Sequence, residues 1–497
     1  MKRKNANVIN NDEKHSSSLL DRGLPNDSQT SQPAEDSKPD DSKVSIKAAV
    51  RFFNGRKRPF LCAALAIVLV LLFSAHALSY HRVDQTGSTK KQRLMYTPVP
   101  KKSRGIFYGP SHLANLLEPR GYIRTDNEED AEYVWVHKPS KIKQKQLKPW
   151  QRANHLPNSY PLSEKGAFVE TMMEYGARTG KNARFVPETY RLYNKKDRQR
   201  FIDRLAEGGM DESWVSKRPH VDGGKGVKFL GPNSKELHVF AKSLQSDPNF
   251  GGKSHSSSAR LIIQKYVNEL LPYHGRKFDL RVYCLVASSV PLVVFYHDGT
   301  LRISLSKYDE NNFSSQQVHL TNWSAQKSAQ GTKDNADEAR ASFKDLASYL
   351  EEYVSQNPRV SHIKDPISHV RDQIKDALAT VAHIYRDLSF SVNVKNHGRK
   401  MCSAENGFAF LGADFMVDSD LKVWITEMQS GPGLSHDSET TRENFAIVLP
   451  GIFEVLKEVR AREMSGELIS EMESPNTWEL IYKDNFRFTY SGGNGGS

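Results

Sequence analysis

Cysteine is scarce in this chain, with three residues, Cys62, Cys284 and Cys402, among 497. They do not stand at the spacing of a metal-binding motif, and they are too few for the crosslinks of a disulfide-rich secreted domain. The sequence therefore excludes a disulfide framework, although it allows one bond. The fold must rely on buried apolar surface instead, and the chain is long enough for two or three domains.

A nucleic-acid signature is also missing. Lys and Arg exceed Asp and Glu by 70 to 58, which gives a formal charge of +12 and suggests an acidic partner. The excess is spread along the chain rather than gathered in one arm, and no aromatic-basic motif of a nucleic-acid-binding domain occurs. We therefore expect a nucleotide and an acidic protein as partners, and no nucleic acid.

The N-terminal part of the chain has little that could form a core. Residues 1–58 form a polar and basic tail, in which residues 1–45 are nearly free of aromatic side chains, so we expect disorder there. Residues 59–78, PFLCAALAIVLVLLFSAHAL, then run without a charged residue apart from His76, which is charged only when protonated. Their length is that of a membrane-spanning helix, about 20 residues.

A buried helix of a soluble domain is the alternative to a membrane span at residues 59–78. The basic residues at 56–58 on one side and the polar stretch after residue 78 on the other favour the span. It begins too far from Met1 for an ordinary cleaved signal peptide, which indicates a signal anchor. Residues 79–103 then form a stalk.

The most informative stretch is residues 410–434, FLGADFMVDSDLKVWITEMQSGPGL. Its two alternating apolar runs flank a polar turn and predict a β-hairpin. With residues 419–422 as the loop, Val423 pairs with Asp418 and Glu427 lies opposite Asp414. Glu427 and Gln429 share a face of their strand because they are two residues apart.

These hairpin side chains suit a metal ion. Cross-strand neighbours are about 5 Å apart at Cβ, so two carboxylates and an amide oxygen could together hold Mg²⁺. The alternative is an edge hairpin with two solvated acids. The apolar neighbours of Asp414 and Glu427 favour the metal site, because an unpaired buried charge is costly, as does the abrupt turn at residues 430–433.

Two further segments suggest phosphate binding. An apolar strand from Trp214 leads to Lys217 and to a glycine-rich loop that contains Lys225. The spacing of a P-loop is absent, and a simple glycine-rich turn is the alternative. In residues 277–283, KFDLRVY, the charged residues Lys277, Asp279 and Arg281 alternate with apolar ones. They form either one face of a phosphate and metal site or a solvated outer face.

Several segments frame these motifs. Residues 133–137, 261–267 and 291–297 read as strands, the last leading toward Arg302. Apolar stripes at helical spacing predict two amphipathic helices, one over residues 343–354 and one that begins at Asp365-Pro366.

Five motifs together resemble the tubulin-tyrosine ligase-like family. They are WVSKRP with the glycines after it, IIQKYV, KFDLRVY, HLTN and the hairpin GADFM…WITEMQ…PGL, in the family's order over residues 104–460. The resemblance implies an α+β, ATP-grasp-like two-lobed fold after the transmembrane helix. It also implies ATP and Mg²⁺ as cofactors and a free amino acid as substrate. We assign residues 104–470 to the catalytic domain and residues 471–497 to a C-terminal tail.

The resemblance also implies roles for individual residues. Lys217 would contact the phosphates, Arg281 would lie beside the nucleotide and acceptor, and Arg302 would help to bind the amino acid or stabilise the transition state. The other nucleotide contacts would come from Lys165, Gln264, Lys265, Tyr266, Asp279, Thr321 and Asn322. The metal ligands would be Asp414, Glu427 and Gln429.

Two positions depart from the family's pattern. The family usually has Asn at the position of Gln429, and commonly Arg at the position of Gly223. Gln keeps a carbonyl ligand but lengthens its reach, so the departure affects the geometry of the metal site rather than metal binding itself.

The expected function is ligation of glutamate to a carboxylate of an acidic protein such as tubulin, through an acyl phosphate. A glycine ligase is the alternative within the same chemistry, because these motifs do not define the amino-acid pocket. A membrane-tethered binding module for microtubules or acidic proteins, without activity, is an alternative of another class. A nucleic-acid binder is a weaker third.

Membrane topology is the first prediction. In the fifteen residues before the apolar segment there are five basic residues and no acid, whereas the fifteen after it hold four basic residues and Asp84. Because positive charge near a span favours the cytoplasmic side, we predict a single-pass type II protein of the Golgi or ER with a luminal catalytic domain.

Protease treatment of intact microsomes tests this orientation and should spare the region after Ser79. Glycosylation at the sequon Asn312-Phe313-Ser314 would support the same orientation. Digestion of that region with survival of residues 1–58 would instead mean a cytoplasmic enzyme that faces tubulin.

Overall fold

The computed structural model describes residues 99–137, 147–156, 159–180, 183–218, 224, 226–252, 260–330, 336–390, 406–434, 436–474 and 476–490. The expected tail, membrane span and most of the stalk lie outside these residues, as do glycine-loop residues 219–223 and 225 and the last seven residues. Among the described residues, no helix has both the length and the apolar character needed to cross a membrane. The span at residues 59–78 therefore stays a prediction.

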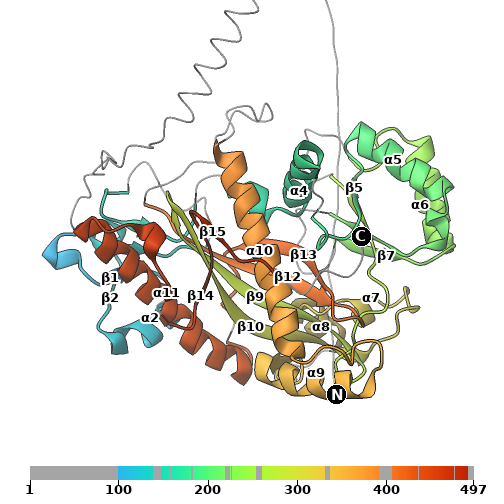
Figure 1. Cartoon of the computed structure of the whole chain (residues 1–497). Coiled ribbons are helices and arrows are strands. Elements are labelled where there is room, and N and C mark those ends of the chain that lie inside the picture. Colours follow the sequence, from blue (N-terminus) through green and yellow to red (C-terminus); the bar gives the residue numbers. More distant parts are fainter. Residues whose placement is uncertain are drawn as a thin grey trace, which may run out of the picture. The chain divides into compact units, whose positions relative to one another are not determined.

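The N-terminal sheet is parallel, with the strand order β2-β1-β3-β4. Its strands are short: β1 (Ile106–Tyr108), β2 (Ile123–Thr125), β3 (Tyr133–Val134) and β4 (Arg152–Ala153). The strand expected at residues 133–137 is thus only two residues long. Trp135 follows it and stacks on Phe453 of α11 (Glu439–Ser465), with 6.1 Å between the ring centroids, which anchors this sheet to the helix beside it (Figure 1).

A second, antiparallel sheet carries the expected lysine strand. Its order is β5-β8-β6-β7, formed by β5 (Thr189–Arg191), β8 (Ile262–Lys265), β6 (Trp214–Lys217) and β7 (Val227–Leu230). Trp214 is fully buried together with Phe201 of α5 (Lys195–Ala206) and Leu237 of α6 (Lys235–Ser246). Because successive residues of a strand point to opposite faces, Val215 and Lys217 point away from this core.

The large sheet has seven strands in the order β13-β12-β9-β10-β14-β15, with β11 paired to β10. The strands are β9 (Arg276–Ser289), β10 (Leu292–Lys307), β11 (Arg340–Ser342), β12 (Ala409–Val417), β13 (Val423–Ser430), β14 (Glu479–Lys483) and β15 (Phe486–Arg487). β14 and β15 fall in the expected C-terminal tail. The folded part of the described chain therefore extends beyond residue 470, at least to Arg487.

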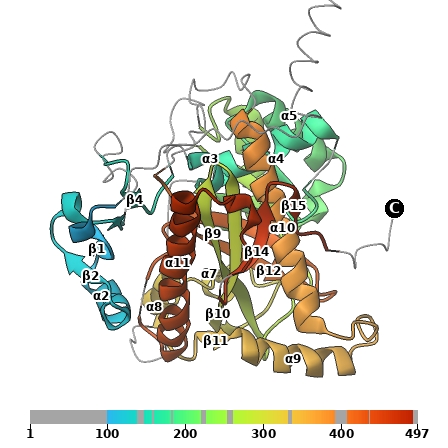
Figure 2. The same cartoon turned by 60° about the vertical axis from the view of Figure 1, so that its left-hand side comes forward.

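Alternation along β9 divides its residues between two faces. Phe278, Leu280 and Val282 belong to the core under α9 (Phe343–Gln356) and α10 (Pro366–Phe390), whereas Tyr283 and Leu285 belong to the core under α11. Helices therefore cover both faces of the large sheet (Figure 2). This mixed α/β architecture is consistent with the expected ATP-grasp-like fold.

α9 and α10 confirm the two predicted amphipathic helices. Their expected stripes are buried, Phe343, Leu346, Leu350 and Val354 in α9 and Val370, Ile374, Leu378 and Val381 in α10. The remaining helices are α2 (Ser111–Leu117), α3 (Tyr160–Ser163), α4 (Lys165–Thr179), α7 (Gln316–His319) and α8 (Trp323–Gln330). Short 3₁₀ turns lie at Lys101–Ser103, Glu118–Arg120, Glu128–Asp130, Gly209–Asp211 and Ile469–Glu471.

The predicted hairpin is formed by β12 and β13, but its register differs near the loop. Val423 pairs with Val417 instead of Asp418, so the predicted pairing at the loop is wrong by one residue. The register then shifts between Phe415 and Asp414, where Thr426 is the extra residue of a β-bulge. This shift places Glu427 opposite Asp414, as predicted.

Candidate active site

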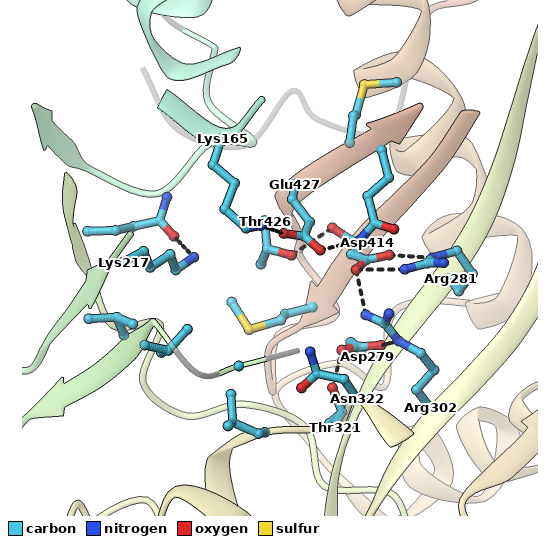
Figure 3. A pocket seen from close by; sticks show the side chains of 18 of the residues that line it. Lys165, Lys217, Asp279, Arg281, Arg302, Thr321, Asn322, Asp414, Thr426 and Glu427 are labelled. Atoms are coloured by element: carbon cyan, nitrogen blue, oxygen red, sulfur yellow. Dashed lines mark hydrogen bonds and ion pairs between the residues drawn. The ribbon is translucent and has the colours of Figure 1, made fainter. Parts of the chain in front are cut away.

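A cavity of about 720 Å³ lies between the second sheet and the large sheet. Its walls come from β6, β8, β9, β10, β12 and β13 and from the segment that follows α7 (Figure 3). The cavity is lined by every residue expected at the site: Lys165, Lys217, Gln264, Lys265, Tyr266, Asp279, Arg281, Arg302, Thr321, Asn322, Asp414, Glu427 and Gln429. Residues far apart in the sequence thus meet in one place.

Strand pairing arranges the charged side chains in two rows across the large sheet. In the first row, Glu427 of β13 pairs with Asp414 of β12, and Asp414 pairs with Arg281 of β9. In the second row, Asp279 of β9 pairs with Arg302 of β10, and Arg302 pairs with Arg340 of β11. Directly paired residues share one face of a sheet, so the register alone brings these charges together.

The carboxylate of Asp414 is the centre of the charge network. It accepts hydrogen bonds from Arg281 Nε at 2.5 Å and Nη2 at 3.1 Å, and from Arg302 Nη2 at 2.6 Å (Figure 3). Burial favours the neutral acid, but the two guanidinium groups outweigh it and hold the pKa of Asp414 well below its usual range. Asp414 therefore stays ionised at any physiological pH.

Asp279 and Thr321 extend this network. Asp279 Oδ1 accepts a hydrogen bond from Arg302 Nε at 2.5 Å, and its other oxygen accepts one from the hydroxyl of Thr321. Burial works against the charge of Arg302, yet Asp279 and Asp414 together raise its pKa. The first residue after HLT, Asn322, lines the cavity beside them.

Glu427 lies at the open end of the first row. Its Oε2 atom is 2.9 Å from Lys165 Nζ, and its Oε1 atom accepts a hydrogen bond from the amide nitrogen of Gln429. The prediction that Glu427 and Gln429 share a face is thus confirmed. Lys165, which stands at the first position of α4, is brought to the site although its part of the sequence carries no clear motif.

The carboxylates and amide suit a hard cation, although they do not form a cluster of acids alone. Among the residues that the structure describes, no three His, Cys, Asp or Glu side chains come together as a metal site. A carboxylate offers about four lone-pair positions. Asp414 uses three of them on arginines, whereas Glu427 uses two, so Glu427 has more capacity for Mg²⁺.

Two lysines of the cavity have lowered pKa values. Burial lowers the pKa of Lys217 to about 8 and that of Lys277 to about 8, and the nearby carboxylates only partly oppose this. Lys217 Nζ donates a hydrogen bond to Gln264 Oε1 at 2.6 Å, and Lys277 Nζ lies 5.3 Å from the centre of the Tyr266 ring. Neither has an ion-pair partner among the described carboxylates, so both are available to an anion such as a polyphosphate.

The residues expected around the adenine form the side of the cavity made by the second sheet. Gln264 is buried, and Lys265 pairs with Glu212 at 2.6 Å. The hydroxyl of Tyr266 contacts the hydroxyl of Tyr308 and His319 Nδ1, each at 2.9 Å. These contacts join Tyr266 to Tyr308, which follows β10, and to His319 of α7.

Some lining residues were not among the expected site residues. His319 is the first residue of the HLTN motif. Burial lowers its pKa to about 4, so it is neutral, and its Nδ1 atom hydrogen-bonds with the hydroxyl of Tyr266. Val215 and Phe229 supply apolar walls. Alternation about Lys217 could have indicated Val215, but no sequence pattern marks Phe229 as a cavity residue.

Comparison with known proteins gives a family match. A model of the tubulin-tyrosine ligase family matches residues 140–464. Protein polyglycylase TTLL10 of Rattus norvegicus is 25% identical over 453 residues, which are 80% of this chain and 61% of that protein. Tubulin polyglutamylase TTLL7 of Mus musculus is 24% identical over 340 residues, which are 65% of this chain and 34% of that protein.

A further relative is inactive polyglycylase TTLL10 of Homo sapiens, 27% identical over 307 residues, which are 60% of this chain and 42% of that protein. The chain spans about half the length of the curated relatives it matches. The family match confirms the resemblance inferred from the five motifs.

The second prediction concerns Gln429. Replacing it by Asn should preserve or raise activity and lower the Mg²⁺ concentration needed, because the shorter amide places the family's usual ligand on the same strand face. Initial rates measured across a Mg²⁺ titration test this. Gln429→Leu, which has similar size but no amide, is the control and should require more Mg²⁺. Complete loss of activity in Gln429→Asn would show that Gln429 does not act as this ligand.

The third prediction concerns pH. Lys217 and Lys277 lose their charge as the pH rises through about 8, so the affinity for a non-hydrolysable ATP analogue should be constant near neutral pH and fall above it. The loss of charge-assisted hydrogen bonds should raise Kd about tenfold. Calorimetric titrations at a series of pH values would show this. A variant with arginine at both positions stays charged and should bind equally well above pH 8; an equal loss in that variant would contradict the assignment.

Proposed function

The chain belongs to the tubulin-tyrosine ligase family, and on this premise we propose that it is an ATP- and Mg²⁺-dependent ligase. It would join a free amino acid, with glutamate as the first choice, to a carboxylate of an acidic protein. The observation that carries the proposal is the cavity in which Asp414, held by Arg281 and Arg302, meets Glu427, Lys217 and Lys277.

The reaction must activate a poor electrophile, because direct displacement at a carboxylate would expel oxide. An oxygen of the acceptor carboxylate attacks the γ-phosphorus of ATP, and the bond to the bridging oxygen breaks to release ADP. The amine nitrogen of the amino acid then attacks the acyl carbon, phosphate leaves, and the nitrogen gives a proton to solvent. The products are the amide, ADP, phosphate and one proton.

The residues of this chain would act mainly by position and charge. Lys217 and Lys277 are placed to bind phosphate oxygens, and Arg281 and Arg302 face the region between the phosphates and the acceptor. Fixed positive groups stabilise the negative charge that gathers on a transferred phosphoryl group. The second sheet would hold the adenine ring of ATP through Gln264, Lys265 and Tyr266.

Mg²⁺ would be held by Glu427, Asp414 and Gln429. When bound, the ion would neutralise charge on the phosphate oxygens and help to orient them. Lys165 is 2.9 Å from Glu427 and keeps that carboxylate directed into the cavity.

A glycine ligase remains the alternative within this chemistry, and relatives named polyglycylase support it. An inactive binding module is supported by the human relative named inactive. Against inactivity, Lys217, Asp279, Arg281, Asp414 and Glu427 are all present and line one cavity, although Gln429 stands in place of the family's usual Asn.

The acceptor depends on the side of the membrane. If residues 59–78 span it with the proposed orientation, the catalytic domain lies in the lumen of the Golgi or ER, and the acceptor is an acidic protein of the secretory pathway. If the orientation is reversed, the tubulin tail becomes the acceptor, in line with the relative named tubulin polyglutamylase.

The fourth prediction tests catalysis. Glu427→Gln should lower Mg²⁺-dependent ligation about 100-fold or more, because it removes a charged metal ligand while it keeps the size of the side chain. The assay is incorporation of labelled amino acid into an acidic peptide. Glu351→Gln, on an exposed position of α9, is the matched control and should retain full activity.

Thermal unfolding should show nearly the same Tm for Glu427→Gln and the parent protein, which separates loss of activity from loss of fold. Glycine incorporation without glutamate would favour the alternative amino acid. If the parent protein ligates no common amino acid, the binding module becomes the better interpretation.

A further inference from the structure

The cations of the site fall into two groups. Asp279, Asp414 and Glu427 neutralise Arg281, Arg302 and Lys165 through the ion pairs described above. Three other cations, Lys217, Lys277 and Arg340, have no carboxylate within ion-pair distance among the described residues. Positive charge therefore exceeds negative charge at the site before any ligand is bound.

Arg340 lies at the end of the second row. β11 places it directly opposite Arg302 across the strand ladder, and like charges in that position are destabilising. Arg340 Nη1 donates a hydrogen bond to the carbonyl oxygen of Ala339 at 2.8 Å. Burial and then Arg302 lower the pKa of Arg340 to about 10, while Asp279 opposes the shift. A bound anion would relieve this electrostatic conflict.

A separate small cavity adjoins Arg340. Its volume is about 60 Å³, and its walls include all three arginines, Arg281, Arg302 and Arg340. Thr300, Ser438 and Thr441 also line it, and Asp437 is the one acidic residue in its wall. This cavity is much smaller than the large one, with about 60 Å³ against about 720 Å³, so a small anionic group such as a carboxylate suits it better than a triphosphate does.

The small cavity borders the reaction centre. Arg281 and Arg302 line both cavities, whereas Lys217 and Lys277 line only the large one and Arg340 only the small one. A polyphosphate would thus meet the lysines on one side of the arginine pair. A second anion would meet Arg340 on the other side.

We propose that Arg340 binds a carboxylate of the incoming amino acid in the small cavity. This inference rests on the proposed function, because it names the binding position for one substrate of that reaction. The carboxylate is either the α-carboxylate, which every amino acid has, or the side-chain carboxylate of glutamate. A guanidinium can bind each of these two carboxylates through two parallel hydrogen bonds.

An amino acid fits this position better than the acceptor protein does. The small cavity offers about 60 Å³ beside three arginines, which suits the single carboxylate of a free amino acid. With its carboxylate held there, the amine of the amino acid would extend past Arg302 toward the large cavity, where the activated acceptor would lie.

The test compares Arg340→Gln and Arg340→Lys with the full-length parent chain. Lys344→Gln removes one positive charge from an exposed position near the start of α9 and is the matched control. Initial rates are measured at saturating ATP with varied glutamate, glutamine and glycine. Arg340→Gln should raise KM for the amino acid about 10- to 100-fold, the value of a charge-assisted hydrogen bond, with KM for ATP unchanged.

The pattern across amino acids identifies the carboxylate. A rise in KM for all three assigns the α-carboxylate to Arg340, and a rise for glutamate alone assigns the side-chain carboxylate. Unchanged KM values, or a rise only for ATP or for the acceptor, would overturn the inference. If Arg340→Gln fails to fold, Arg340→Lys decides, because it keeps the charge but loses the paired hydrogen bonds and should still raise KM several-fold.

A binding measurement separates this inference from the proposed function. Glutamate in the presence of ADP should raise the Tm of the parent protein, and Arg340→Gln should lose that rise. If the parent ligates nothing but shows the rise and the variant loses it, the proposed function fails and the assignment of Arg340 stands. If the parent and the variant are stabilised equally, or neither is stabilised by any of the three amino acids, the assignment fails.

Discussion

The ion pairs of the buried Asp414 carboxylate are the interaction on which the site depends. Asp414 comes from β12, Arg281 from β9 and Arg302 from β10, so one carboxylate links three neighbouring strands of the large sheet. Removing one partner of such a buried pair leaves an uncompensated charge that costs about 3–5 kcal/mol. Without Asp414 the two arginines would also repel each other, and the cavity face of the sheet would lose its order.

Much of this face could be predicted from alternation along the strands. The pattern in β9 correctly separated the polar side chains at 277, 279 and 281 from the core, and the hairpin prediction correctly placed Glu427 opposite Asp414. The predicted pairing at the loop was wrong because alternation carries no mark of a β-bulge. In the sequence, polar Thr426 looks like an ordinary residue of the outward face of the strand. In the structure it is the extra residue of the bulge, and it brings Glu427 opposite Asp414.

Other parts of the site could not be predicted because no local pattern encodes them. β11 has only three residues, too few for a period, so nothing in the sequence shows that Arg340 lies opposite Arg302. His319 belongs to a motif of the sequence, but its structural role depends on hydrogen bonds that link it through Tyr266 to Tyr308, and these two residues come from other segments. Such contacts depend on the tertiary fold, so local secondary-structure propensity does not predict them.

The cations of the site without carboxylate partners among the described residues are divided between two cavities. Lys217 and Lys277 line the large cavity, where we propose that the nucleotide binds, whereas Arg340 lines only the small one. Unpaired cations are unfavourable for stability, and such local conflicts are expected where a ligand supplies the missing charge. Because only Arg281 and Arg302 line both cavities, a substitution around Arg340 need not disturb the lysines proposed to bind phosphate. That separation is compatible with relatives of this chain named both polyglycylase and polyglutamylase.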